Sequence, residues 1–209
     1  GDAGVAYGAC LLSEIKNNPR SKLQKTENFY KGYISSEREI TKTLKKSKLK
    51  CTNFKNKIYK KTAELLKKGK IIAWCQDGAE FGPRALGNRS IIAKPYPTEI
   101  KDHINKNVKF REYFRPFAPA VLEEDLFKFF EINQKSPHML IACKVKSKKS
   151  KIIPALVHVD NTCRVQSVSK KLNLKFWKLI NEFNKITNVP VILNTSFNIK
   201  GQPIVNNSE

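Results

Sequence analysis

The segment from residue 80 to residue 90, EFGPRALGNRS, constrains the fold most, because it makes a poor helix and a poor strand. Its two glycines permit backbone conformations that a Cβ forbids, and its proline fixes its own φ. We therefore expect a rigid loop that aims its side chains. Only seven of the 40 basic residues are arginine. Arg84 and Arg89 are thus candidates for holding carboxylate or phosphate by two parallel hydrogen bonds; the alternative is that they pair with carboxylates of the fold.

The charge of the chain is strongly positive, with 40 basic residues, 18 acidic residues and a formal net charge of +22. Such a balance raises nucleic acid as a partner, because neutralising phosphates releases counterions. However, the lysines are scattered among Asn and Ile, and no recognition helix, zinc finger or aromatic RNA-binding motif accompanies them. We therefore disfavour nucleic acid as a partner and keep a basic RNA-binding module as an alternative function.

The five cysteines form no CxxC pair and are odd in number, which favours neither a zinc cluster nor a disulfide framework. No apolar run reaches the length of about 18 residues that a membrane span needs. No secretion signal is recognisable at the start of the chain. Both ends of the chain look cut from something longer. We expect a reducing, cytoplasmic compartment and no membrane.

Periodicity along the chain predicts helices and strands that mix without a strict βαβ rhythm, which indicates an α/β domain with a mixed sheet. Residues 20–55 are polar and lysine-rich, and we interpret them as a linker or a solvated surface. The expected helices cover 5–15, about 56–66, 98–107, 124–131 and 174–187. The expected strands cover 70–75, 90–93, 117–122, 139–145, 155–159, 164–168 and 190–193, with a tight turn at Asp160-Asn161.

Two polar clusters follow period-two spacing. In an extended segment Lys109 and Arg111 point the same way, as an anion clamp, with Phe110 on the buried side; the alternative is a solvated edge strand. Similarly, His158 shares a face with Asp160, and Arg164 shares one with Gln166. We favour His158 as a satisfied core histidine over an acid or base. Arg164 is the better functional candidate, because it is an isolated arginine in a strand-like run.

A third cluster comes directly after the apolar strand 190–193, at the edge where α/β sheets bind ligands. Its hydroxyl and amide side chains can hydrogen-bond phosphates together with backbone N–H groups, and helix capping or an Asx-turn is the alternative. The cluster consists of Asn194, Thr195, Ser196 and Asn198. Walker, GxGxxG, HExxH and GxSxG motifs are absent from the sequence, so the common nucleotide and hydrolase signatures do not apply.

Five motifs occur in a fixed order: GDAG, FGPRALGNRS, VKFREYFRPFAPAV, HVDNTCRVQSV and PVILNTSFNIKGQPIV. They resemble the carbamoyltransferases that modify antibiotics and nodulation factors. The resemblance covers about residues 1–12 and 56–209, and members of that family resemble two-module enzymes. It implies an α/β fold in which a YrdC-like domain, with a twisted mixed parallel/antiparallel sheet flanked by helices, follows the remnant of an actin-like domain. Residues 1–19 would end that actin-like domain, 20–55 would link, and 56–209 would form the YrdC-like domain, truncated at its C-terminus.

The resemblance also implies a reaction. The YrdC-like module would turn carbamoyl phosphate and ATP, with Mg²⁺, into a carbamoyl-adenylate for transfer to a hydroxyl of a sugar or antibiotic-like small molecule. A KxR and SxN signature would be Lys109 with Arg111 and Ser196 with Asn198. Arg84, Lys109 and Arg164 match positions that hold the carbamoyl phosphate and nucleotide phosphates, which needs several fixed cations. From the polar clusters described above we add His158, Asp160, Asn194 and Thr195 to the predicted binding set.

Asp2 of GDAG matches a metal-ligand aspartate of the actin-like module, which would hold a divalent Fe, Mn or Zn ion with histidines outside this sequence. A homodimer is compatible with the resemblance. Asn161 stands where the family often has glycine, which would alter the turn near Asp160. A threonylcarbamoyl-adenylate synthase of tRNA modification is a weaker alternative, because GDAG is joined to the same chain.

Overall fold

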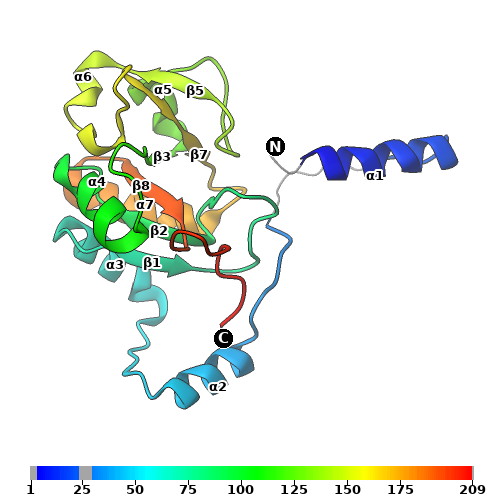
Figure 1. The fold of residues 1–209 in the computed structure, drawn as a ribbon, viewed down its shortest axis with the longest axis horizontal. Helices are drawn as coiled ribbons and strands as arrows, with labels where there is room; N and C mark the ends of the chain where they lie inside the picture. Colours follow the sequence, from blue (N-terminus) through cyan, green and yellow to red (C-terminus); the bar gives the residue numbers. More distant parts are fainter. Residues whose placement is uncertain (1–3, 24–29, 209) are drawn as a thin grey trace.

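A five-stranded mixed sheet lies at the centre of the protein in the computed structural model, which describes residues 4–23 and 30–208 (Figure 1). Its strand order is β1 (Ile72–Cys75), β2 (Arg89–Ala93), β8 (Val191–Ser196), β3 (Ala118–Leu122) and β7 (Gln166–Val168). The first four strands pair antiparallel, whereas β3 and β7 run parallel. The predicted mixed sheet is therefore confirmed.

A smaller antiparallel sheet packs beside the first one. Its strands are β4 (Phe130–Glu131), β5 (Ala142–Val145) and β6 (Thr162–Arg164). Only Val165, which is fully buried, separates β6 from β7. One extended run thus passes from the small sheet into the large one and carries side chains of both toward the same region.

Two helices, α3 (Ile58–Lys67) and α7 (Leu174–Thr187), pack against each other, and α7 also contacts β3 and β8. The spacing of apolar residues on α7 gives it one continuous buried face, consisting of Phe176, Leu179, Ile180 and Phe183. The helix begins where the Asn173 side chain accepts a hydrogen bond from Phe176 N, and it ends at Asn188 in the left-handed conformation. Both helices confirm the expectation from periodicity.

Two short regions differ from the expected elements. A helix was predicted over 124–131, but the structure has the 3₁₀ turn η3 (Glu123–Asp125), the single turn α5 (Leu126–Phe129) and then β4, because Phe130 pairs with Val145. A strand was predicted over 155–159, but Pro154 opens the 3₁₀ turn η4 (Pro154–Leu156). The other short elements are η1 (Lys55–Lys57), α4 (Glu99–Ile104), η2 (Asn105–Lys109) and α6 (Ser147–Ser150).

The helices α1 (Gly4–Asn17) and α2 (Glu37–Ser47) bury none of their residues, and Figure 1 shows α1 pointing away from the sheets. The helix α2 lies within the predicted linker or solvated surface and begins with a capping box between Ser36 and Glu39. Just before it, Gly32 N donates to Ala79 O at 2.9 Å. Among the residues described, no helix has the length and apolarity that crossing a membrane requires.

Candidate active site

The loop from 76 to 90 is built around two charged side chains, the half-buried Glu80 and the buried Arg89. Glu80 Oε1 accepts backbone N–H groups from Leu86 at 2.7 Å, Asn88 at 2.8 Å and Arg89 at 3.2 Å. Gly87 has a φ of +105°, and a Cβ there would lie 2.3 Å from the Phe176 ring. The loop is therefore shaped by its own residues, as predicted, and could not tolerate a side chain at Gly87.

Arg89 has a structural place in this loop. It is only 2% exposed, and its guanidinium group donates to five backbone carbonyls, those of Tyr33, Gln76, Asp77, Asn88 and Asn206. The prediction that Arg89 binds an anion is wrong, and within residues 4–23 and 30–208 no carboxylate forms an ion pair with it. It ties the loop to the segment around Tyr33 and to the C-terminal segment.

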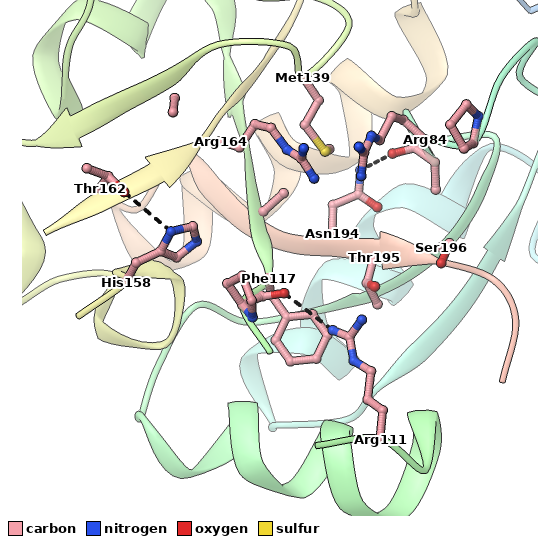
Figure 2. A pocket seen from close by; sticks show the side chains of 15 residues that line it. Arg84, Arg111, Phe117, Met139, His158, Thr162, Arg164, Asn194, Thr195 and Ser196 are labelled. Atoms are coloured by element: carbon pink, nitrogen blue, oxygen red, sulfur yellow. Dashed lines mark hydrogen bonds between the residues drawn. The ribbon is translucent and has the colours of Figure 1, made fainter. Parts of the chain in front are cut away.

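Arg84, from the same loop, lines a cavity of about 410 Å³. The cavity lies between the loop, the end of β8, the segment 111–118, residues 139–142 and β6. Figure 2 shows the guanidinium groups of Arg84 and Arg164 on the Asn194 side, and that of Arg111 beside Phe117. None of the described residues that line the cavity is acidic. Three arginines without a lining carboxylate make this cavity suited to an anion.

Arg111 is held in the cavity wall by the protein itself. Its Nε donates to Asn105 Oδ1 at 2.7 Å, and its guanidinium carbon lies 4.7 Å from the centre of the Phe117 ring. The sequence did not point to Phe117 as a platform for Arg111, although aromatic rings commonly stack on arginine. With Nε and one ring face fixed, the remaining N–H groups of Arg111 are oriented by the fold.

The predicted extended conformation of 109–111 is wrong. The helix α4 continues into η2, which is a π-helical turn, and Phe110 ends it in the left-handed conformation with a φ of 50°. Phe110 is 60% exposed instead of buried. Lys109 and Arg111 nevertheless reach neighbouring hollows, because Lys109 turns inward while Arg111 lies on the wall between the two.

A second hollow of about 280 Å³ adjoins the cavity and shares Arg111 and Ser196 with it. Lys109 is 3% exposed, and its Nζ donates to Ser196 O at 2.8 Å and to Asn198 Oδ1 at 2.7 Å. Burial, and secondarily the charge of Arg111, lowers the pKa of Lys109 to about 8. Lys109 therefore fixes the segment from 196 to 198 and brings a titratable charge to this hollow.

The rim of the second hollow carries two more cations. Glu112 lies between them, 3.0 Å from Arg115 Nε and 3.2 Å from Lys200 Nζ. Both Arg115 and Lys200 line the hollow, where cations outnumber the single acid among the described lining residues. Glu112 thus keeps two exposed cationic side chains near the second hollow.

His158 lines the cavity, half-buried, 3.4 Å from Thr162 Oγ1. Burial lowers the pKa of His158, which favours the neutral ring. Asp160 lines a neighbouring hollow instead, and it accepts from Thr162 N at 3.0 Å and Thr162 Oγ1 at 2.7 Å, which lowers its pKa. The turn expected at Asp160-Asn161 is present, with Asn161 at a φ of 60°.

The structure brings most of the predicted site residues to the two hollows. The cavity is lined by Arg84, Arg111, His158, Arg164, Asn194, Thr195 and Ser196. Lys109 and Asn198 line the second hollow, with Arg111 and Ser196 again. Asp2 lies outside the described residues, and within those that are described no group of three or more His, Cys, Asp or Glu side chains could hold a metal ion. Met139 and Thr162 line the cavity without a signal in the sequence.

Comparison with known proteins decides the family. Residues 63–209 match the family model described as the carbamoyltransferase C-terminus. This chain belongs to the carbamoyltransferase C-terminal family. Among curated relatives, nodulation protein NolNO of Sinorhizobium fredii is 42% identical over 98% of the chain and 31% of its own length, and nodulation protein NolO of Bradyrhizobium diazoefficiens is 40% identical over 98% and 38%. The chain thus spans between 31% and 38% of these relatives.

Solved structures of HypF also align with the chain. The T. kodakarensis protein covers 70% of this chain and 18% of its own, with 20% identity and a TM-score of 0.46. Full-length HypF in its phosphate- and nucleotide-bound form covers 75% of this chain and 19% of its own, with 19% identity and a TM-score of 0.48.

Proposed function

We propose that this chain forms a carbamoyl-adenylate from carbamoyl phosphate and ATP. In the whole protein, the carbamoyl group would then pass to a hydroxyl of a small-molecule acceptor such as a sugar or an antibiotic-like compound. The single observation that carries the proposal is the pair of adjoining cationic hollows that share Arg111 and Ser196. A reaction between two phosphate compounds needs two such places side by side.

The reaction balances as two steps. Water first cleaves the oxygen–phosphorus bond of carbamoyl phosphate, which gives carbamate and inorganic phosphate. A carbamate oxygen then attacks the α-phosphorus of ATP, and pyrophosphate leaves. Both steps bring anions together and develop charge at phosphorus, so fixed cations lower the barrier through electrostatic stabilisation. In this assignment the cavity takes carbamoyl phosphate, and the second hollow takes the polyphosphate of ATP.

The residues fit these roles by their chemistry. Arg84 and Arg164 offer planar donors to the phosphate of carbamoyl phosphate. Arg111, on the shared wall, can contact both anions. Lys109 positions Ser196 and Asn198 for the nucleotide and supplies a positive charge beneath its phosphates. Mg²⁺ would enter with ATP and neutralise phosphate charge, whereas the divalent Fe, Mn or Zn ion expected at Asp2 would belong to the transfer module.

Exchange of labelled pyrophosphate into ATP, dependent on carbamoyl phosphate, tests the proposal on the 209-residue chain without any acceptor. We expect exchange in the wild type. In Arg164→Ala the exchange rate should fall about 100-fold or more, because removing one oriented donor to a developing charge lowers the rate by this factor. Arg38→Ala, on the exposed surface of α2, is the matched control and should retain full exchange. No exchange in the wild type, or full exchange in Arg164→Ala, would overturn the assignment.

A further inference from the structure

One atom in the cavity lacks a partner. Asn194 is 1% exposed and lines the cavity, and its Oδ1 is buried with no hydrogen-bond partner. Leaving a buried acceptor unpaired costs about 1–3 kcal/mol. A buried polar atom that bears this cost calls for an explanation, such as a functional role or a bound water or ion, and Glu80 Oε2 in the loop is a second such atom. Figure 2 shows the Asn194 side chain beside the guanidinium group of Arg84.

The orientation of the Asn194 amide is fixed by its neighbours. Its Nδ2 donates to Ala85 O at 2.9 Å and to Gln166 Oε1 at 3.1 Å. The first partner is a backbone carbonyl and can only accept. Gln166 is itself fixed, because its Nε2 donates to Leu86 O at 2.8 Å. A flipped amide would place its oxygen against two acceptors, so Oδ1 is the atom left without a partner in the wall of the cavity.

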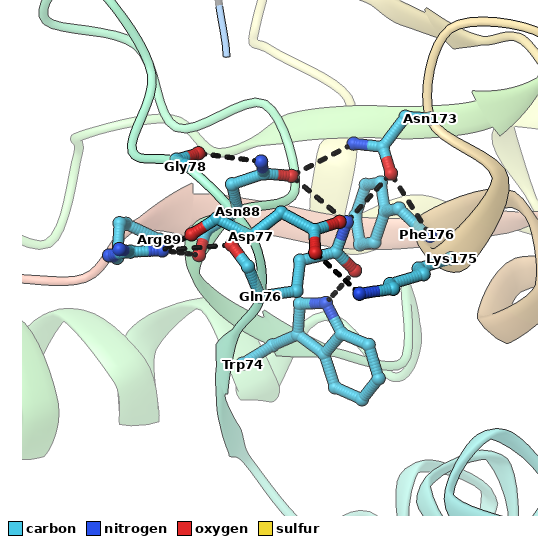
Figure 3. Close-up of polar contacts among 9 residues, drawn as sticks. All are labelled: Trp74, Gln76, Asp77, Gly78, Asn88, Arg89, Asn173, Lys175 and Phe176. Atoms are coloured by element: carbon cyan, nitrogen blue, oxygen red, sulfur yellow. Dashed lines mark hydrogen bonds and ion pairs between the residues drawn. The ribbon is translucent and has the colours of Figure 1, made fainter. Parts of the chain in front are cut away.

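A buried chain of amides supports this orientation from further away (Figure 3). Trp74 Nε1, which can only donate, bonds Gln76 Oε1 at 2.8 Å. Gln76 Nε2 therefore donates onward to Asn173 Oδ1 at 2.7 Å, and Asn173 Nδ2 faces Leu86 O at 3.4 Å. The Leu86 carbonyl oxygen also accepts the hydrogen bond from Gln166 Nε2. Every amide between the indole and the cavity thus has one allowed orientation, and the series ends at an unused acceptor.

The arrangement specifies what the cavity accepts. Its arginines are complementary to an anion, whereas Asn194 Oδ1 is complementary to a hydrogen-bond donor on the same molecule. Phosphate, pyrophosphate and acetyl phosphate carry no N–H group. Carbamoyl phosphate carries an NH₂ group on the carbonyl carbon, which the bridging oxygen joins to phosphorus. A methyl group in that place would leave the buried oxygen unpaired, and a site built for a polar group rejects such an analogue.

We propose that Asn194 is the specificity-determining residue for the carbamoyl group, because its Oδ1 accepts a hydrogen bond from the carbamoyl nitrogen. This inference rests on the proposed function. It assigns the discrimination between carbamoyl and acyl phosphates to one oxygen atom at the end of an oriented amide series. Arg84 and Arg164 bind the phosphate and contribute equally to both kinds of ligand.

Two stable phosphonates test this on the 209-residue chain by calorimetry. Phosphonoacetamide and 2-oxopropylphosphonate differ only in NH₂ against CH₃. We expect the wild type to bind the amide at least about 10-fold more tightly, as an unpaired buried acceptor implies. In Asn194→Ala the preference should fall to within about 3-fold. Alanine leaves no acceptor to be unpaired, and water can enter the space of the missing amide and hydrogen-bond the polar groups around it. Asn133→Ala, at an exposed position that lines neither hollow, should keep the wild-type preference.

The outcomes separate the two proposals. Equal binding of both phosphonates by the wild type, alongside carbamoyl-phosphate-dependent exchange, overturns the role of Asn194 and leaves the proposed function standing. A preference that survives in Asn194→Ala likewise overturns it. Binding of neither phosphonate together with absence of exchange overturns both. If Asn194→Ala does not fold, the wild-type comparison alone decides, since it changes the same contact from the ligand side.

Discussion

Two ends of one loop use arginine in opposite ways. Arg89 is enclosed by five backbone carbonyls and holds segments of the chain together. Arg84, five positions earlier, lines the cavity. Both are arginines in the same glycine-bearing stretch, so residue type and local sequence do not separate them. Arginine marks a ligand site only where the fold leaves its donors facing a hollow.

The amides repeat this contrast. The Asn88 side chain donates to Gly78 O at 2.7 Å and accepts from Gln76 and Asn173, so its polar atoms are used within the protein. Asn194 uses its nitrogen in the same way but keeps an unused oxygen. The region around Arg89 uses the donors of its side chains within the protein and stabilises the loop, whereas the region around Arg84 lines the cavity.

The largest expected effect is on stability at the closed end. Arg89→Met should lower the free energy of unfolding by about 3–5 kcal/mol, because it strands several buried carbonyls without donors. Arg84→Met should lower it by less than about 1 kcal/mol. Urea denaturation of the two variants measures both values. Equal losses would remove the distinction between the two ends of the loop.

The next effect is on activity at the open end. Arg84→Lys keeps the charge but loses the planar pair of donors, so we expect kcat/KM for pyrophosphate exchange to fall about 10- to 100-fold. Its melting temperature should stay at the wild-type value, which thermal unfolding checks. Unchanged exchange would show that charge alone, without the geometry of arginine, suffices at this position.

A smaller effect concerns pH in the second hollow. Because the pKa of Lys109 is lowered to about 8, its positive charge is present below that pH and lost above it. Affinity for ATP should therefore fall several-fold as pH rises through about 8. The KM for ATP in pyrophosphate exchange, measured from pH 7 to 9.5, reports this. Lys109→Arg should show no break in that range, since arginine stays charged.

The smallest effect is expected at Asp160, which lies outside the cavity although it was predicted to belong to the binding set. Asp160→Asn keeps one oxygen that can accept from Thr162, so exchange should remain within about two-fold of the wild type. His158→Gln, inside the cavity, is the informative comparison in the same assay. A loss at Asp160 as large as at Arg164 would extend the site beyond the cavity described.

Local sequence predicted those elements whose signal is repeated and strong. The helix α7 shows a continuous apolar face, and β8 is an apolar run closed by polar residues, so both follow from periodicity. The segments 109–111 and 155–159 were predicted incorrectly. There a π-helical turn and a proline-initiated 3₁₀ turn replaced the period-two reading, because tertiary packing and proline geometry outweighed a short pattern.

For the site, the sequence by itself determined the candidates: the motif arginines, Lys109, and the hydroxyl and amide cluster after the apolar strand. Only the tertiary structure decided which of them face a ligand. Arg89 was enclosed by carbonyls from 33, 76–77, 88 and 206, which no local pattern reveals. The unused oxygen of Asn194 depends on Ala85 and Gln166, distant in sequence, because hydrogen-bond satisfaction is a property of the assembled neighbourhood.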